Sequence, residues 1–275
     1  MLIRFGYHVT INCAQPTPLI CLLALREERR PDLEQQGPVI TMPDTRMSTY
    51  RDLFGNTCLR MTAPAGDFSI RHDCTIRDSG EPDAYLPHLM QEPIEALPDD
   101  VMLYLLGSRY CETDRLSQTA WNLFGNTAPG WTRVQAICDY VKGHIRFDYQ
   151  LARNTRTAED AWHEQVGVCR DFAHLGIALC RAMNIPARYV NGYLGDIQVP
   201  VVDPMDFSAW IEVYLGGRWV TFDPRNNTRR IGRIKVAHGR DAADVPLVHS
   251  FGPHMLNRFS VWCYDLANPP RNLPD

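Results

Sequence analysis

The sequence predicts an α+β fold in which a small antiparallel β-sandwich comes first and a mixed helical and β domain follows. Two observations separate these parts: up to about residue 95, short runs with strand-like alternation stand between turn signals, and beyond it apolar residues recur at helical spacing. A third observation is a patterned helix followed by a strand and a hairpin between residues 167 and 223. We therefore expect an N-terminal domain over residues 1–95 and a second domain over residues 96–275.

The first part contains five runs of the length and composition of strands. They are Leu2–Asn12, Pro18–Arg26, Val39–Met42, Asn56–Thr62 and Gly66–Arg77. Asp52–Asn56 is a turn between two of them, and the regular spacing is typical of a β-sandwich. Ser79–Asp100 is rich in Pro, Asp and Glu, so we interpret it as the linker.

Helical patterns cover Thr113–Phe124 and Trp131–Gly143, for which Thr113 and Thr132 are suitable N-caps. An extended segment is expected to begin at Ile145–Tyr149. After residue 223 we expect a basic stretch over Arg225–Arg240 and a closing strand over Phe259–Leu266. The basic residues Arg225, Arg229, Arg230, Arg233 and Lys235 fit a solvated strand face better than a site for an acidic substrate.

Cys169 stands at the first turn of the most strongly patterned helix. Phe172, Gly176, Leu179 and Met183 share one face, which predicts that this face packs on the core. The helix ends at 184–186, where Asn-Ile-Pro precedes a strand. Unpaired N–H groups and the positive end of the helix dipole favour a thiolate there, so we expect a thiol pKa below the free value of about 8.5. The same N–H groups are suited to an oxyanion, although a lone cysteine is more often a buried structural residue.

A β-hairpin follows this helix and strand in the sequence. Residues 209–215 alternate as a strand, Gly216-Gly217 makes a tight turn, and residues 218–222 return to Asp223-Pro224.

Together these motifs resemble the transglutaminase-like superfamily, a group of papain-like cysteine enzymes. Gly167–Ala173 fits the family's G-x-C-x-x-[FY]-[AS] stretch, and the resemblance implies that Cys169 is the nucleophile. Trp219–Pro224 fits W-x-x-[FL]-D-P and implies that Asp223 is the orienting acid. The resemblance runs from about Trp131 to Asp223. It implies a papain-like (transglutaminase-core) fold, preceded by the β domain found in bacterial members of the family.

One position departs from the family pattern. Where the family has His-Ala-Trp-x-Glu, this chain has Ser208-Ala209-Trp210-Ile211-Glu212. We expect Ser208 to occupy the histidine's place, with its side chain pointing at Cys169 and Asp223 behind it. A hydroxyl cannot accept a thiol proton at neutral pH as imidazole does.

Other histidines of the chain are therefore candidates for the base. His174 lies about 140° around the helix from Cys169, on the side of Arg170 and Arg181, so we expect it to be solvated or ion-paired. His249 and His254 lie in and just after the stretch 246–253, which is able to fold back over the cleft. His144 ends a helix, where a cation suits the dipole, so its role is predicted to be structural.

The composition restricts the cellular location and the binding partners of the protein. The net charge of −4 over 275 residues gives no attraction to nucleic acid or membrane surfaces, and residues 18–25 form an apolar run too short to span a bilayer. Nine cysteines without a C-x-x-C pair argue against a disulfide framework or a zinc site. We expect a cytoplasmic protein with no cofactor and no metal.

Three functions remain open. The first is a thiol enzyme that hydrolyses or transfers the acyl group of an amide in a peptide or protein substrate, through Cys169, Ser208 and Asp223. The second is a catalytically impaired peptide-binding or scaffold module that keeps the papain-like cleft. The third is a redox-sensing thiol, disfavoured because Cys180 lies about 16 Å along the same helix and cannot pair with Cys169.

Overall fold

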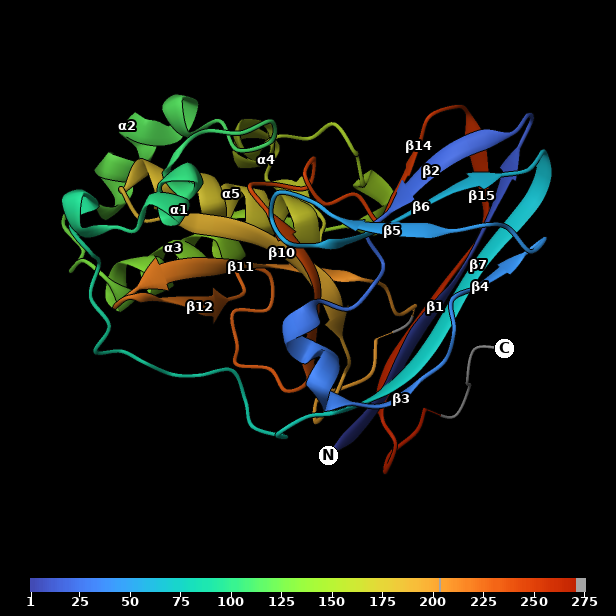
Figure 1. The fold of residues 1–275 in the computed structure, drawn as a ribbon. Coiled ribbons are helices and arrows are strands. Elements are labelled where there is room, and N and C mark those ends of the chain that lie inside the picture. Colours follow the sequence, from blue (N-terminus) through green and yellow to red (C-terminus); the bar gives the residue numbers. More distant parts are fainter. Residues whose placement is uncertain (203, 271–275) are drawn as a thin grey trace.

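The structure, a computed structural model, describes residues 1–202 and 204–270. Figure 1 shows long strands gathered on one side of the molecule and helices above a smaller sheet on the other. Buried side chains of both halves belong to one hydrophobic cluster. The last five residues of the expected second domain lie outside the described part.

Two antiparallel sheets build the strand-rich half. One has the order β15-β1-β7-β3, with β4 also paired to β7, and the other has the order β14-β2-β6-β5. The strands from the first part of the chain are β1 Leu2–Cys13, β2 Thr17–Cys21, β3 Leu33–Gln36, β4 Ile40–Met42, β5 Ser48–Arg51, β6 Thr57–Ala63 and β7 Gly66–Arg77. Alternate residues of β1 and β7 are buried, as expected for strands with one face on a core. Among the described residues, no helix is long and apolar enough to cross a membrane.

The end of the chain returns to these sheets. β14, Val248–Ser250, pairs with β2, and β15, His254–Asp265, pairs with β1 along its whole length. Our expectation that residues 96–275 form one separate domain therefore needs correction at this end. Val261, Trp262 and Cys263 are buried against the sheet of β1, and that buried surface places the closing strand there.

The helical half surrounds a four-stranded antiparallel sheet of order β12-β11-β10-β13. Its strands are β10 Ala187–Leu194, β11 Ser208–Leu215, β12 Arg218–Phe222 and β13 Arg233–Gly239, and a short parallel pair is formed by β8 Arg146–Phe147 and β9 Val166–Gly167. Its α-helices are α1 Asp99–Met102, α2 Thr113–Phe124, α3 Trp131–His144, α4 Ala158–Glu164 and α5 Cys169–Ala182. Short 3-10 helices lie at Glu27–Asp32, Ile94–Ala96, Leu103–Leu105 and Tyr149–Leu151. The expected α+β fold, with the Cys169 helix on a sheet that contains the 209–222 hairpin, is confirmed.

Helix α5 is buried on all sides from Asp171 to Ala182, whereas the pattern predicted one buried face. Gly176 lies against Ile211 of β11 and Pro224, which follows β12, while α2, α3 and α4 pack around the rest of the helix. The Arg181 guanidinium is buried because it donates to the backbone oxygens of Leu106, Ala187 and Arg240. A central helix of this kind gives Cys169 a fixed platform.

The turn Asp52–Asn56 joins the two halves. The Asn56 side chain donates to the backbone oxygen of His238 at 2.8 Å and accepts from its N–H at 3.0 Å. Asp52 in turn accepts from the N–H groups of Phe54 and Asn56. This turn, the clamp turn below, fixes the strand-rich half on β13.

The expected linker also makes specific contacts. The Asp83 N–H donates to the Arg230 backbone oxygen, and the Asp83 carboxylate accepts from the Arg230 N–H, both at 2.9 Å. The same carboxylate holds the Arg233 guanidinium at 2.8 and 3.0 Å. The basic stretch is therefore not a solvated strand face. Arg233 pairs with Asp83 and Asp223, and Lys235 with the largely buried Glu212.

Candidate active site

The start of α5 is held by a buried carboxylate. Asp171 accepts from the N–H of Val168 at 2.9 Å and from Arg156 at 3.2 Å. The helical hydrogen bonds begin with the N–H groups of Asp171 and Phe172, both donated to the Val168 oxygen. The N–H of Cys169 precedes this ladder of helical hydrogen bonds.

The Cys169 thiol faces the open edge of β11. Strand β12 pairs with β11 only from Ile211 onward, so the first residues of β11 have no strand neighbour on that side. The backbone N–H of Ala209 lies against the thiol there and favours its ionised form. The start of β11 and the start of α5 therefore meet at the sulfur.

The Cys169 thiol is not held in its ionised, nucleophilic form. Burial raises the pKa of Cys169 to about 11, against the opposing effects of the Arg225 guanidinium and the Ala209 N–H. Our expectation of a pKa below 8.5 is wrong because burial of the thiolate outweighs the helix start. Cys169 is nevertheless the one cysteine of the nine that is partly exposed.

Both carboxylate oxygens of Asp223 accept hydrogen bonds from neighbouring residues. One carboxylate oxygen accepts from the N–H groups of Arg225 and Asn226, and the other accepts from the Asn226 amide and from Arg233, both at 2.8 Å. Burial opposes ionisation of Asp223, but Arg233 and Asn226 prevail and hold its pKa below the usual value. The carboxylate is therefore ionised and rigidly held.

Ser208 begins β11 and is 5% exposed. Its strand face also carries Trp210, over whose ring the Arg233 guanidinium lies 5.0 Å from the centroid. Since Arg233 binds Asp223, Ser208 lies on the face of the sheet that holds this carboxylate. The Ser208 hydroxyl has no hydrogen-bond partner among the described residues.

The candidate replacement histidines lie elsewhere. His174 is buried rather than solvated, stacks on Tyr110 and accepts from the N–H of Ala242 at 3.1 Å. Burial, reinforced by Arg170 and Arg181, lowers its pKa far below 6.5, so it is neutral. His249 pairs with Ile20 in the strand-rich half, and His254 contacts Ser250. His144 has the expected structural role, with its ring 2.7 Å from the Trp162 oxygen.

Sequence reasoning missed four charged residues near the site. Arg233 binds Asp223, and Asp83 binds Arg233. The charges of Asp206 and Arg225 act in opposite directions on ionisation of the thiol. The motifs gave no signal for Asp83 or Asp206, and the two arginines were part of the expected solvated face.

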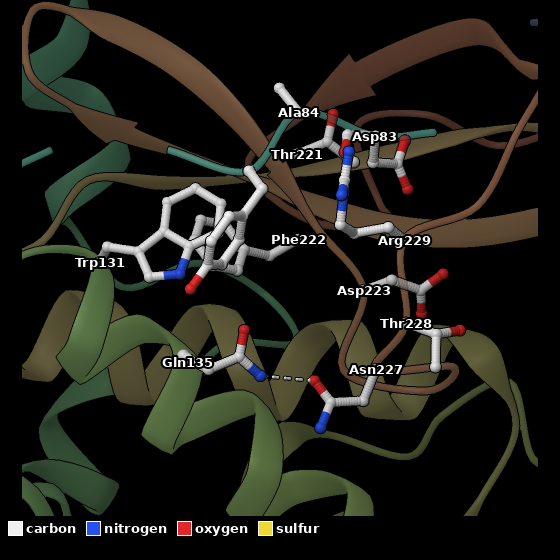
Figure 2. A pocket seen from close by; sticks show the side chains of 11 residues that line it. Asp83, Ala84, Trp131, Gln135, Thr221, Phe222, Asp223, Asn227, Thr228 and Arg229 are labelled. Atoms are coloured by element: carbon white, nitrogen blue, oxygen red, sulfur yellow. Dashed lines mark hydrogen bonds between the residues drawn. The ribbon is translucent and has the colours of Figure 1, made fainter. Parts of the chain in front are cut away.

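A hollow of about 220 Å³ adjoins Asp223. Figure 2 shows Trp131 and Phe222 on one side of it and Asp83 with Arg229 on another, and Gln135 bonds Asn227 at 2.9 Å across it. Cys169 is not among the residues that line it. The hollow thus lies beside Asp223, the carboxylate of the candidate site.

Comparisons with known proteins agree with this architecture. A family model described as the transglutaminase-like superfamily matches residues 118–224. An uncharacterized protein of Mycobacterium leprae is 43% identical over 215 residues, which cover 75% of this chain and 76% of that protein. An uncharacterized protein of Mycobacterium tuberculosis is 43% identical over 90 residues, 29% of each chain. A crystal structure from Cytophaga hutchinsonii, described as that of a candidate cysteine protease, is 32% identical, covers 98% of this chain and 92% of its own, and superposes with a TM-score of 0.84.

Proposed function

Because the chain belongs to the transglutaminase-like superfamily, we propose that it is a thiol enzyme that hydrolyses or transfers the acyl group of an amide in a peptide or protein substrate. Cys169 is the nucleophile, Ser208 stands in the place of the family's histidine, and Asp223 is the orienting acid. The observation that carries the proposal is the meeting of the Cys169 thiol with the open edge of β11 at the start of a buried helix.

The surroundings of the sulfur suit acyl transfer. An acyl carbon bonded to Cys169 would place its oxygen near the helix start, where the N–H of Cys169 is free of the helical ladder. Fixed N–H groups of this kind stabilise the negative oxygen of a tetrahedral intermediate. Asp171 and Arg156 keep this backbone in place before substrate arrives.

A second function is favoured by a specific observation. The thiol has a raised pKa, and no histidine is among the groups that act on it. This supports the alternative of a peptide-binding or scaffold module that keeps the cleft without efficient chemistry.

The experiment compares four proteins on acyl substrates: wild type, Cys169→Ala, Ser208→His and the control Cys180→Ala. We expect slow turnover by wild type, none by Cys169→Ala, and at least a tenfold increase in Ser208→His, because imidazole returns to its family position. Folding of each variant is checked by thermal unfolding. Binding of peptides without turnover in any variant would favour the module instead.

We also propose a cytoplasmic location. All nine cysteines are free thiols, and eight of them are buried, as suits a reducing compartment. Labelling of the thiols in intact cells and in cell fractions tests this proposal.

A further inference from the structure

We propose that Asp206 and Arg225 together replace the missing imidazole: Arg225 stabilises the Cys169 thiolate, and Asp206 carries the proton. This inference rests on the function proposed above and names the groups that make it possible. The family's histidine would supply both a cation beside sulfur and a proton acceptor, whereas here the two tasks fall to separate side chains.

The position of Asp206 follows from its neighbour. Phe207 is buried in an aromatic cluster, with ring centroids 4.7 Å from Tyr193, 6.4 Å from Tyr7 and 6.1 Å from Phe259. Side chains alternate along extended backbone, so Asp206 projects away from this cluster, as Ser208 does. Asp206 is therefore displaced by two residues from the position of the lost histidine and lies on the same side.

Arg225 is positioned by the loop after β12. Its N–H donates to Asp223 at 3.1 Å, and its guanidinium lies over the Phe147 ring, 4.2 Å from the centroid. This ring contact holds the cation without neutralising it, so its charge remains available to the sulfur. Arg225 is the strongest of the charged groups that favour the thiolate.

The titratable and charged groups that interact electrostatically with the sulfur come from several elements. Arg225 follows β12, Asp206 precedes β11, Asp171 lies on α5, and Tyr149 and Tyr189 approach from the segment after β8 and from β10. Burial raises the pKa of Asp206 above its usual range, against the effects of the Phe207 N–H and Arg225. A carboxylate with a raised pKa is a stronger base toward the thiol proton than a fully solvated carboxylate.

The proposed step balances as follows. The thiol proton passes to the Asp206 carboxylate while sulfur bonds to the amide carbon. When the carbon–nitrogen bond breaks, the proton passes from Asp206 to the leaving amine and a thioester remains on Cys169. Water or a second amine then attacks the thioester, and Asp206 takes its proton and delivers it to the departing sulfur.

Two variants test the charge of Arg225 separately from the proton transfer by Asp206. Arg225→Gln removes the cation, so we expect alkylation of Cys169 by iodoacetamide at pH 8 to slow about tenfold or more. Asp206→Asn removes a negative charge, so we expect alkylation to become several-fold faster while amide turnover falls at least tenfold. Asp114→Asn, at an exposed carboxylate on α2, serves as the matched control and should change neither rate.

A comparison of leaving groups sharpens the test. An activated p-nitrophenyl ester needs no proton for departure, so Asp206→Asn should lose less activity on the ester than on the aminomethylcoumarin amide of the same acyl group. Equal amide turnover in wild type and Asp206→Asn, with wild type active and Cys169→Ala inactive, would overturn this inference alone. No turnover by wild type would overturn the proposed function as well, whereas unchanged alkylation in Arg225→Gln would refute the role of the cation whatever the turnover.

Discussion

At the scale of single residues, the site shows that a helix start does not by itself activate a thiol. The Cys169 sulfur has the N–H of Ala209 and the charge of Arg225 beside it, yet burial still raises its pKa to about 11. For this largely buried sulfur, the loss of hydration costs the thiolate more than these partners return. The family's histidine would add a second cation here, and Ser208 adds none.

The pH dependence of alkylation follows from this. With a thiol pKa of about 11, the rate of iodoacetamide labelling of Cys169 should rise about tenfold per pH unit from pH 7 to about 10, since only the thiolate reacts. At pH 7 the rate should be a few hundredfold below that of a free cysteine with a pKa near 8.5. Peptide mapping by mass spectrometry gives the rates.

The control is Cys180, which is buried on the same helix and should stay unlabelled until the protein unfolds. A labelling rate for Cys169 that levels off below pH 9 would contradict the raised pKa.

At the scale of elements, long strands and helices could be predicted because apolar residues recur along each of them with one dominant spacing. The strand Gly66–Arg77 and the helix Thr113–Phe124 have their predicted bounds. The strands β3 and β5 have no buried residue and so no alternation to detect. Helix α4 was missed although Thr157 and Asp160 form a capping box at its start, a signal that the sequence does contain.

The site was predictable to the extent that it depends on local motifs. The Cys169 helix start and the 209–222 hairpin could be placed because each is a continuous segment. The partners of Asp223 could not, since Arg233 lies on another strand and Asp83 in the expected linker. Side-chain pairs of this kind are fixed by tertiary packing.

A close approach within the core sheet gives an element-scale prediction. A Cβ on Gly192 of β10 would lie 2.1 Å from the Ile234 backbone oxygen and 2.9 Å from the Trp210 ring. We expect Gly192→Ala to lower the free energy of unfolding by about 3 kcal/mol or more, because backbone must move to admit the methyl group. Urea unfolding measures the difference.

Gly143 of α3 is the matched control. It is exposed, and a Cβ there would meet no atom within 4 Å. Gly143→Ala should therefore stabilise the protein by about 0.5–1 kcal/mol through helix propensity. Equal effects of the two substitutions would show that the β10–β13 contact is looser than described.

At the scale of the whole molecule, the two halves behave as one body because they share a core and a polar clamp. Buried residues of both halves form a single cluster, and the clamp turn 52–56 inserts Asn56 against β13. Phe54 of the same turn lies near Tyr104, with ring centroids 6.5 Å apart.

The clamp makes a prediction for stability. Asn56→Ala should lower the free energy of unfolding by about 2–4 kcal/mol, because the N–H and oxygen of His238 lose their partners while they stay buried. Leu53→Ala changes a fully exposed side chain in the same turn and should have an effect within about 0.5 kcal/mol. Equal free energies of unfolding for Asn56→Ala and Leu53→Ala would show that apolar packing alone joins the halves.

The pairing of β1 with β15 has a consequence for synthesis of the protein. β1 ends at Cys13, so it is synthesised well before its partner over residues 254–265. Until β15 has been made, one edge of β1 leaves its backbone N–H and C=O groups unpaired, a state that invites association with other chains. The topology therefore imposes an order of events in which this edge of β1 stays open until residues 254–265 have been made and pair with it.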